Sequence, residues 1–160
     1  MVRGSMSVLV ERGFTLVELI VTMIVIGILA VTVIPRFADR ASFDARGFHD
    51  RTLSILRYAQ KSAVAQRRRM CVVFGTDSSV TVTVATNFGD AACDPTLYLV
   101  GPDGKALDAI AAPATGGFKA QPTDLSFLPS GSLASPVLPI VVKGMETTPI
   151  TVVAATGYVY

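Results

Sequence analysis

The fold is decided near the start of the chain, where residues 14–34 read FTLVELIVTMIVIGILAVTVI. This apolar stretch carries a single ionisable side chain, that of Glu18. As an α-helix it would reach roughly 32 Å at about 1.5 Å per residue, which is enough to cross a bilayer core of about 30 Å. The sequence therefore predicts one transmembrane helix.

Composition supports a membrane segment or a secreted fold and excludes several other classes. Hydrophobic residues make up 51% of the 160 residues and charged residues 16%, so an intrinsically disordered chain is excluded. A net charge of +2 is too small to argue for nucleic-acid binding. Two cysteines and one histidine cannot complete a zinc cage or a Cys-His-Asn protease site, so no metal and no catalytic residue is predicted.

A short polar leader, MVRGSMSVLVERG, occupies residues 1–13. An ordinary secretory signal has a shorter apolar region, with its small-residue cleavage site after that region. Here the small residue, Gly13, stands before the apolar stretch. A peptidase that cuts after Gly13 would leave the apolar helix on the mature protein. The alternative is a plain signal anchor in which this glycine is accidental.

Glu18 needs an explanation, because a carboxylate inside hydrocarbon costs several kcal/mol unless it is paired. Residues 14–34 contain no lysine, arginine or histidine that could pair with it. If the chain is cut after Gly13, the free α-amino group of Phe14 in a neighbouring copy would serve as the partner. The alternative is that the side chain snorkels to the nearby headgroups.

Residues 13–20, GFTLVELI, resemble the signal of type IV prepilins and type II secretion pseudopilins. The resemblance implies that a prepilin peptidase of the inner membrane cleaves after Gly13 and that Phe14 is N-methylated. It also implies that Glu18 pairs with the N-terminal amine of an adjacent subunit during assembly. Residues 14–35 would then form the helix that lies in the filament core after assembly.

A second, amphipathic part of the N-terminal helix is expected over residues 36–69. Gly27 and Pro35 fall where such pilins carry helix-weakening residues, and Pro35 is expected to kink the helix because it lacks an amide donor. Beyond it, apolar residues recur at helical spacing and form one stripe: Leu53, Leu56, Ala59 and Ala63. We expect this stem to pack on a globular head.

Charge is divided unevenly between the stem and the head. Residues 36–69 carry nine basic and three acidic residues, a net charge of +6, whereas residues 70–160 carry three basic and seven acidic residues, a net charge of −4. Stems and heads of neighbouring copies would attract each other, which favours assembly into a filament.

The basic end of the stem allows a second function, because Lys61, Arg67, Arg68 and Arg69 could grip the phosphates of DNA. Such binding occurs in some minor pilins of DNA uptake. The simpler interpretation is that the three arginines complement the helix dipole and stay solvated. His49 lies among polar stem residues and is interpreted as a surface histidine.

The head, residues 70–160, is predicted to be antiparallel β structure. Residues 70–75 form an apolar run, residues 80–84 alternate in polarity, and a turn at 76–79 lies between them, which is typical of a β-hairpin. Further strands are expected over residues 97–100, 125–128, 140–143, 150–154 and 158–160. The predicted fold is α+β, the pilin fold, with two small sheets against the long helix.

Two further segments extend the resemblance toward the C-terminus. Residues 125–131, LSFLPSG, and 150–159, ITVVAATGYV, are similar to the end of GspH/FimT-type pseudopilins. Residues 42–48 and 56–61 are similar to minor pilins of mannose-sensitive haemagglutinin pili. The head of such proteins faces the oxidising periplasm, which implies a disulfide between Cys71 and Cys93; two buried free thiols are the alternative.

The resemblance implies a minor pilin or pseudopilin, a structural subunit that helps a filament to assemble or begin at the inner membrane. Its implied partners are other pilin or pseudopilin subunits, the prepilin peptidase, the inner-membrane assembly platform and the membrane itself. A DNA-binding minor pilin is the alternative. An enzyme has little support, no cofactor is implied, and a type IV pilus and a type II secretion pseudopilus fit equally well.

Overall fold

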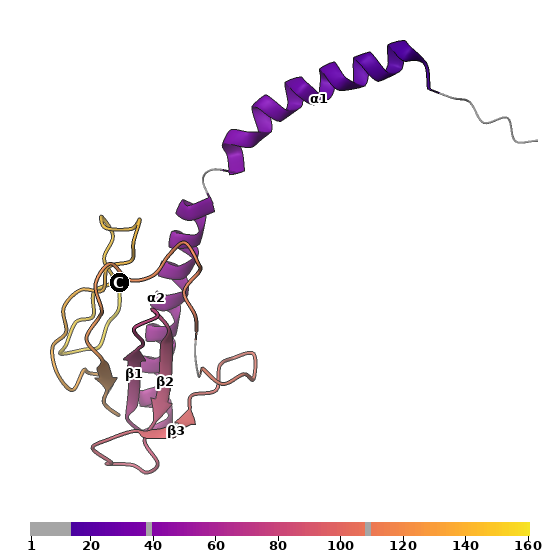
Figure 1. The fold of residues 1–160 in the computed structure, drawn as a ribbon. Helices are drawn as coiled ribbons and strands as arrows, with labels where there is room; N and C mark the ends of the chain where they lie inside the picture. The colour runs from indigo at the N-terminus through magenta and orange to yellow at the C-terminus, as the bar shows by residue number, and fades with distance from the viewer. Residues whose placement is uncertain (1–13, 38–39, 108–109) are drawn as a thin grey trace, which may run out of the picture. The chain divides into compact units, whose positions relative to one another are not determined.

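The structure is a computed structural model that describes residues 14–37, 40–107 and 110–160, and the chain divides into two compact units between Asp39 and Arg40. The N-terminal unit contains helix α1 (Leu16–Phe37). The second, here called the globular unit, contains α2 (Arg40–Gln66), β1 (Met70–Phe74), β2 (Val80–Val84), β3 (Asp94–Tyr98) and β4 (Leu125–Phe127) (Figure 1).

Helix α1 begins directly after Thr15, whose hydroxyl oxygen accepts a hydrogen bond of 3.3 Å from the Glu18 amide. A threonine at this position satisfies one of the amide donors that the first turn leaves unpaired. Among the described residues, no helix is both long enough and apolar enough to span a membrane. The prediction of a transmembrane helix over residues 14–34 is therefore not confirmed.

The sheet of the globular unit has four antiparallel strands in the order β3-β2-β1-β4. Strands β1 and β2 pair in register from Met70 opposite Val84 to Phe74 opposite Val80. The Gly75 amide donates to the Ser79 carbonyl oxygen and closes the turn between them. The hairpin predicted over residues 70–84 is confirmed.

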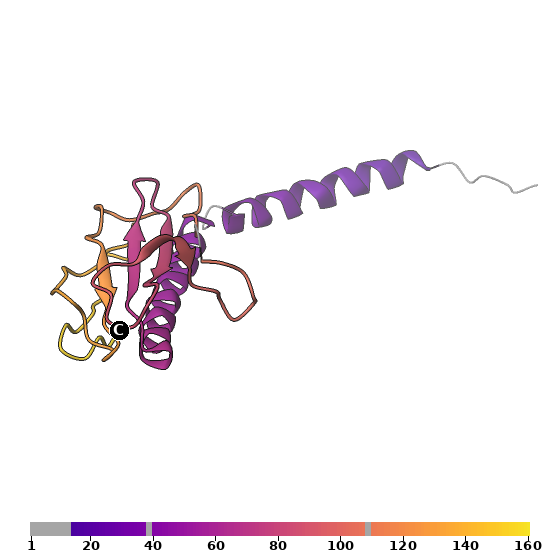
Figure 2. The same cartoon turned by 90° about the horizontal axis from the view of Figure 1, so that it is seen from below.

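Helix α2 lies along one face of this sheet and contacts β1 and β4 (Figures 1 and 2). Its buried side includes Leu56, Ala59 and Ala63, three of the four residues in the predicted stripe, whereas Leu53 is half-buried at the edge of the core. From the sheet, the side chains that face the helix or fill the space beside it are Met70, Val72, Val82, Leu125 and Phe127. The α+β class with a helix packed on an antiparallel sheet is confirmed.

The second predicted sheet is not found in the described parts of the chain. Residues 140–143, 150–154 and 158–160 pair only as isolated bridges, which join Ile140 to Ile150, Val142 to Phe118, and Val152 to Val159. Pro139 and Pro149 each precede a bridging isoleucine, and a proline cannot donate to a ladder of hydrogen bonds. The segments still bury their apolar side chains in the core of the globular unit.

Two element boundaries also differ from the predictions. Helix α2 ends at Gln66 rather than at residue 69, and the strand expected over residues 97–100 is found as β3, Asp94–Tyr98. The pairing of β3 with β2 shifts register at Thr83 and Val84. This irregular pairing leaves β3 largely exposed at one edge of the sheet.

We predict that Leu56→Ala lowers the free energy of unfolding by about 3 kcal/mol, because the substitution leaves a cavity between α2 and the sheet. Leu56 is fully buried, whereas Val64 on the same helix is 49% exposed, so Val64→Ala is the matched control and should change stability little. Denaturant titrations of both variants followed by circular dichroism measure the difference. Equal losses in the two variants would contradict the packing described for α2.

Candidate functional site

The N-terminal end of α1 carries the residues singled out for maturation and assembly. Gly13, the predicted cleavage position, lies outside the described residues. Phe14 is 79% exposed, and Glu18 is exposed in the first turn of α1. Thr15 and Glu18 have the sequence spacing of a helix-capping box, and the Glu18 amide donates to the Thr15 hydroxyl oxygen.

The position of Glu18 gives its carboxylate a favourable local field, because the first turn is the positive end of the helix dipole. Within the part of the chain that the structure describes, no lysine, arginine or histidine forms an ion pair with it. The carboxylate is thus held at the helix start without burial. A cation brought by another molecule can reach it.

Helix α1 continues through both Gly27 and Pro35, so neither residue ends the helix. A methyl group added at Gly27 would meet no atom within 4 Å, so the glycine is not required by packing inside the described structure. A kink at either residue remains a prediction.

The arginine triplet ends α2 and is largely engaged by the fold. Arg67 has a positive φ of 52°, the Arg68 amide donates to the Ala63 carbonyl oxygen, and the Arg67 amide donates to that of Val64. This pattern is the Schellman motif, in which a left-handed residue satisfies the last helical carbonyls. The backbone at these arginines turns the chain from α2 into β1.

The side chains of two of these arginines also have partners in the globular unit. The Arg68 guanidinium donates to the Thr86 carbonyl oxygen, and Arg69 Nη1 lies 3.4 Å from Ser126 Oγ. Arg67 is exposed. Lys61 lies on the exposed face of α2, where it lines a surface pocket that contains none of the three arginines. The four cations considered for DNA binding therefore do not form one solvated cluster.

A disulfide joins Cys71 of β1 to Cys93, the residue before β3, with a Cα–Cα distance of 6.1 Å. It reaches past β2, which lies between β1 and β3 in the sheet. The loop between β2 and β3 is thereby tied to the centre of the sheet.

Three carboxyl groups have a lowered pKa, and each forms part of a turn. Hydrogen bonds from the Thr96 hydroxyl and amide lower the pKa of Asp94, and hydrogen bonds from Ser79 lower that of Asp77. The pKa of Glu146 is lowered by its own amide and by that of Gly144. Asp77 and Glu146 are exposed and Asp94 is half-buried, and the hydrogen bonds that lower each pKa also stabilise the turn that holds the carboxylate.

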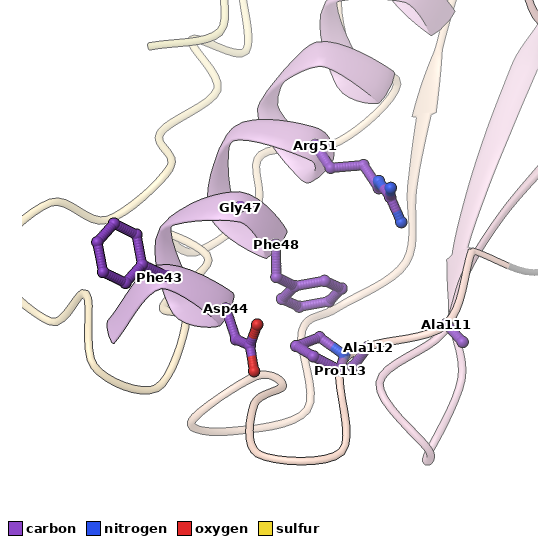
Figure 3. A pocket seen from close by; sticks show the side chains of 8 residues that line it. All are labelled: Phe43, Asp44, Gly47, Phe48, Arg51, Ala111, Ala112 and Pro113. Carbon is purple, nitrogen blue, oxygen red and sulfur yellow. The ribbon is translucent and has the colours of Figure 1, made fainter. Parts of the chain in front are cut away.

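A surface pocket of about 280 Å³ lies beside the first turns of α2 (Figure 3). The Phe48 ring faces Pro113 across it, and Arg51 extends from the next turn of the helix. Asp44 at its rim accepts a hydrogen bond of 2.8 Å from the Thr115 hydroxyl. The lining contains no nucleophile paired with a base, so it offers no constellation for covalent catalysis.

His49 is not the surface histidine that the sequence suggested. Its side chain is 12% exposed, Nε2 lies 3.0 Å from the Thr148 carbonyl oxygen, and Nδ1 lies 3.0 Å from an Asp50 carboxylate oxygen. Its role is to fasten the loop around Thr148 to α2. No group of three or more metal-ligating side chains occurs in the described ranges.

Comparison with known families agrees with this division into an apolar N-terminal helix and a globular unit. Residues 10–34 match the prokaryotic N-terminal methylation motif. Residues 49–157, more than half of the chain, match the type II transport protein GspH. The chain belongs to the GspH family. Searches of curated proteins and of solved structures gave no match.

Membership of the GspH family confirms the resemblance to type IV pilins and pseudopilins. Both matched families are structural pilin or pseudopilin proteins. They imply contacts with other pilus or pseudopilus subunits and with the prepilin peptidase. The methylation motif covers Gly13, Phe14 and Glu18, and the GspH match covers nearly all of the globular unit.

The GspH-family chain fastens its C-terminal part to α2 through side chains that sequence reasoning missed. Gln60 Nε2 donates to the Thr156 carbonyl oxygen at 2.8 Å, and Arg57 Nε donates to that of Val159 at 3.0 Å. Gly157 has a φ of +66° and passes so close to Gly131 that a side chain at residue 157 would clash. The turn dipeptides Ser130-Gly131 and Thr156-Gly157 were visible in the sequence, but their mutual contact was not.

Because Arg67 occupies a left-handed position, we predict that Arg67→Gly leaves stability unchanged or raises it by up to about 1 kcal/mol. Gln66→Gly, one residue earlier at the end of α2, should lower it by about 0.5–1 kcal/mol, because glycine is disfavoured in a helix. Thermal unfolding of the two variants, followed by circular dichroism, measures the contrast. A larger loss in Arg67→Gly than in Gln66→Gly would contradict the Schellman ending.

Proposed function

We propose that this protein is a minor pilin or pseudopilin, a structural subunit of a type IV pilus or a type II secretion pseudopilus. It would help the filament to assemble or begin at the inner membrane. The observation that carries the proposal is the methylation motif on an apolar helix next to a GspH-type globular unit in one chain.

The surface of α1 supports an assembly role. Large apolar side chains are exposed around its described turns, among them Leu16, Ile20, Met23, Ile24 and Ile28. Exposed apolar surface of this extent marks a lipid contact or a protein interface. In the proposed mechanism it contacts lipid first, and then the apolar helices of neighbouring subunits once the protein has been extracted into the filament.

Maturation would prepare the charged end of this helix. Cleavage after Gly13 creates an α-amino group on Phe14, which is exposed, and a methylase can then modify that amine. Glu18 lies one helical turn further on, so its carboxylate is near the new terminus. Pairing between Glu18 and the amine of an adjacent subunit neutralises both charges in an apolar setting, where an unpaired charge is costly.

The proposed location is the inner membrane, with the globular unit in the periplasm before export into the filament. The disulfide between Cys71 and Cys93 supports an oxidising compartment. DNA binding through Lys61 and the three arginines receives no comparable support, because the backbone of the triplet ends α2 and the side chains of Arg68 and Arg69 contact Thr86 and Ser126.

We predict that Glu18→Ala abolishes incorporation into filaments but leaves membrane insertion intact, since it removes a charge and no apolar surface. Thr22→Ala, one turn further along the same exposed helix, is the matched control. Immunoblots of membrane and sheared-filament fractions measure both steps. Filaments that contain normal amounts of the Glu18→Ala protein would refute the pairing role.

We also predict that the mature protein begins at methylated Phe14 and is two hydrogens lighter than its reduced form. Intact-mass spectrometry with N-terminal fragmentation, on protein from native membranes, measures both features. Gly13→Ala should slow cleavage and leave unprocessed chain. A wild-type protein that starts at Met1 would refute the maturation step.

A further inference from the structure

A groove runs along the exposed side of α2, between this helix and the segment that follows β3. It has a volume of about 420 Å³ and is here called the basic groove. Its lining residues from α2 are Arg51, Ser54, Ile55, Arg57, Tyr58 and Lys61, and those from the facing segment are Pro102 and Leu107. Most of its exposed lining is apolar, and three cations stand around it.

Both walls of the basic groove are fixed by hydrogen bonds. The Tyr58 hydroxyl donates to the Val100 carbonyl oxygen at 2.8 Å, which ties the helix to the facing segment. Arg57 Nε donates to the Val159 carbonyl oxygen, so the base of that guanidinium is held in place. The groove is therefore preformed, and a ligand would lose little free energy in ordering it.

The charge of the groove is not balanced within the described residues. No carboxylate there forms an ion pair with Arg51, Arg57 or Lys61. An occupant that carries an apolar side chain beside an acidic one would match both the floor and the rim.

The chain itself displays such a segment, in the loop between β2 and β3. Residues 87–90, here called the Phe88 turn, form a turn in which the Asp90 amide donates to the Asn87 carbonyl oxygen. Gly89 has a φ of +88°, as the third residue of a type II turn requires. Phe88 at the tip of this turn is 74% exposed.

The Phe88 turn is braced rather than loose. Asp90 Oδ2 accepts a hydrogen bond of 2.7 Å from the Asn87 amide, Arg68 donates to the Thr86 carbonyl oxygen, and the disulfide anchors Cys93 to β1. A large aromatic side chain held in solvent by a braced turn has the properties of an interface anchor.

We propose that the Phe88 turn of one copy of this chain inserts into the basic groove of a second copy. Phe88 would fill the apolar floor near Ile55 and Leu107, and Asp90 would face the cations of the rim. Residues 85–94 contain two carboxylates, those of Asp90 and Asp94, and no basic residue. The Arg68 guanidinium lies at the base of the turn on the Thr86 carbonyl oxygen, so the charge match is confined to Asp90 at the tip and the cations of the rim. The proposal rests on the proposed function, because it requires copies of the chain to assemble.

The proposed contact would be heterologous. The anchor and the groove are different surfaces of one molecule, and the exposed loop lies at the end of the globular unit away from the start of α2 (Figure 1). A contact between two different surfaces is heterologous, so each bound copy presents a free groove or a free turn to the next one. Such a contact can extend without closing.

Cysteine cross-linking of the full chain in its native membrane tests the proposal. Two differently tagged versions are expressed together, one with Asn87→Cys beside the anchor and one with Ser54→Cys in the groove. Both positions are exposed, and the two native cysteines are already bonded to each other. Mild oxidation should join the two tagged chains into a mixed dimer.

Controls separate the contact from chance collisions. Leu138→Cys is 79% exposed but lies outside the proposed contact, and it should not cross-link to Ser54→Cys. Adding Phe88→Ala to the Asn87→Cys chain should lower the yield of mixed dimer about tenfold, because it removes the central aromatic anchor. Phe88→Tyr should retain most of the yield. Adding Lys61→Glu to the Ser54→Cys chain should lower it by reversing one rim charge.

A third cysteine distinguishes this proposal from the proposed function. Ile24→Cys on the exposed surface of α1 reports whether copies assemble through that helix. Cross-links at Ile24 without mixed dimers between Asn87 and Ser54 would overturn the docking of the Phe88 turn and leave the subunit role standing. No cross-links at any of these positions would overturn both. Mixed dimers that are insensitive to Phe88→Ala would also overturn the proposed anchor.

Discussion

The globular unit depends on the close approach of α2 to its sheet. The helix presents small side chains where the approach is closest, and Ala59 and Ala63 are completely buried. Their size lets α2 lie close to β1 and β4, which it contacts, and lets Gln60 reach the backbone of the C-terminal turns. Because most of the C-terminal third has bridges instead of strands, these contacts with α2 are what give it a defined path.

The two units handle apolar surface in opposite ways. The globular unit buries more of its large aliphatic and aromatic side chains than it exposes, and the buried ones include the cluster in which the Phe118 ring lies 5.1 Å from that of Phe48 and 5.3 Å from that of Phe74. In helix α1, the large apolar side chains between Leu16 and Leu29 are exposed. The globular unit thus removes apolar surface from water by its own folding. The apolar surface of α1 can be removed from water only by contact with another molecule or a lipid. A GspH-family subunit of a filament needs both behaviours in one chain.

Local sequence signals predicted the elements whose geometry is local. The Val80 to Val84 alternation gave the hairpin, and the spacing of Leu56, Ala59 and Ala63 gave the buried side of α2. Features set by distant contacts were missed. An example is His49, whose side chain is largely shielded from solvent and lies against the Thr148 carbonyl oxygen. The second sheet was overestimated because apolar alternation outweighed the prolines that interrupt its ladders.

In the candidate site too, features of contiguous sequence were predicted and features of the folded backbone were not. The motif at Gly13, Phe14 and Glu18 is contiguous and could be recognised without coordinates, and the family match over residues 10–34 agrees with it. The sequence shows the positive charge of the arginine triplet. Its role in ending α2 depends on the positive φ of Arg67, which cannot be predicted from composition. The exposure of Phe88 could not be predicted either, because the sequence of a loop does not determine whether an isolated phenylalanine points into the core or into solvent.

The short passage from α2 into β1 has a mechanical consequence. Only residues 67–69 separate the end of the helix from the first residue of the strand, and Arg67 reverses the chain within that link. A pull along α2 would therefore reach β1 with almost no slack. Strand β1 is flanked by β2 and β4 and is cross-linked through Cys71, so the load would spread across two ladders and a covalent bond.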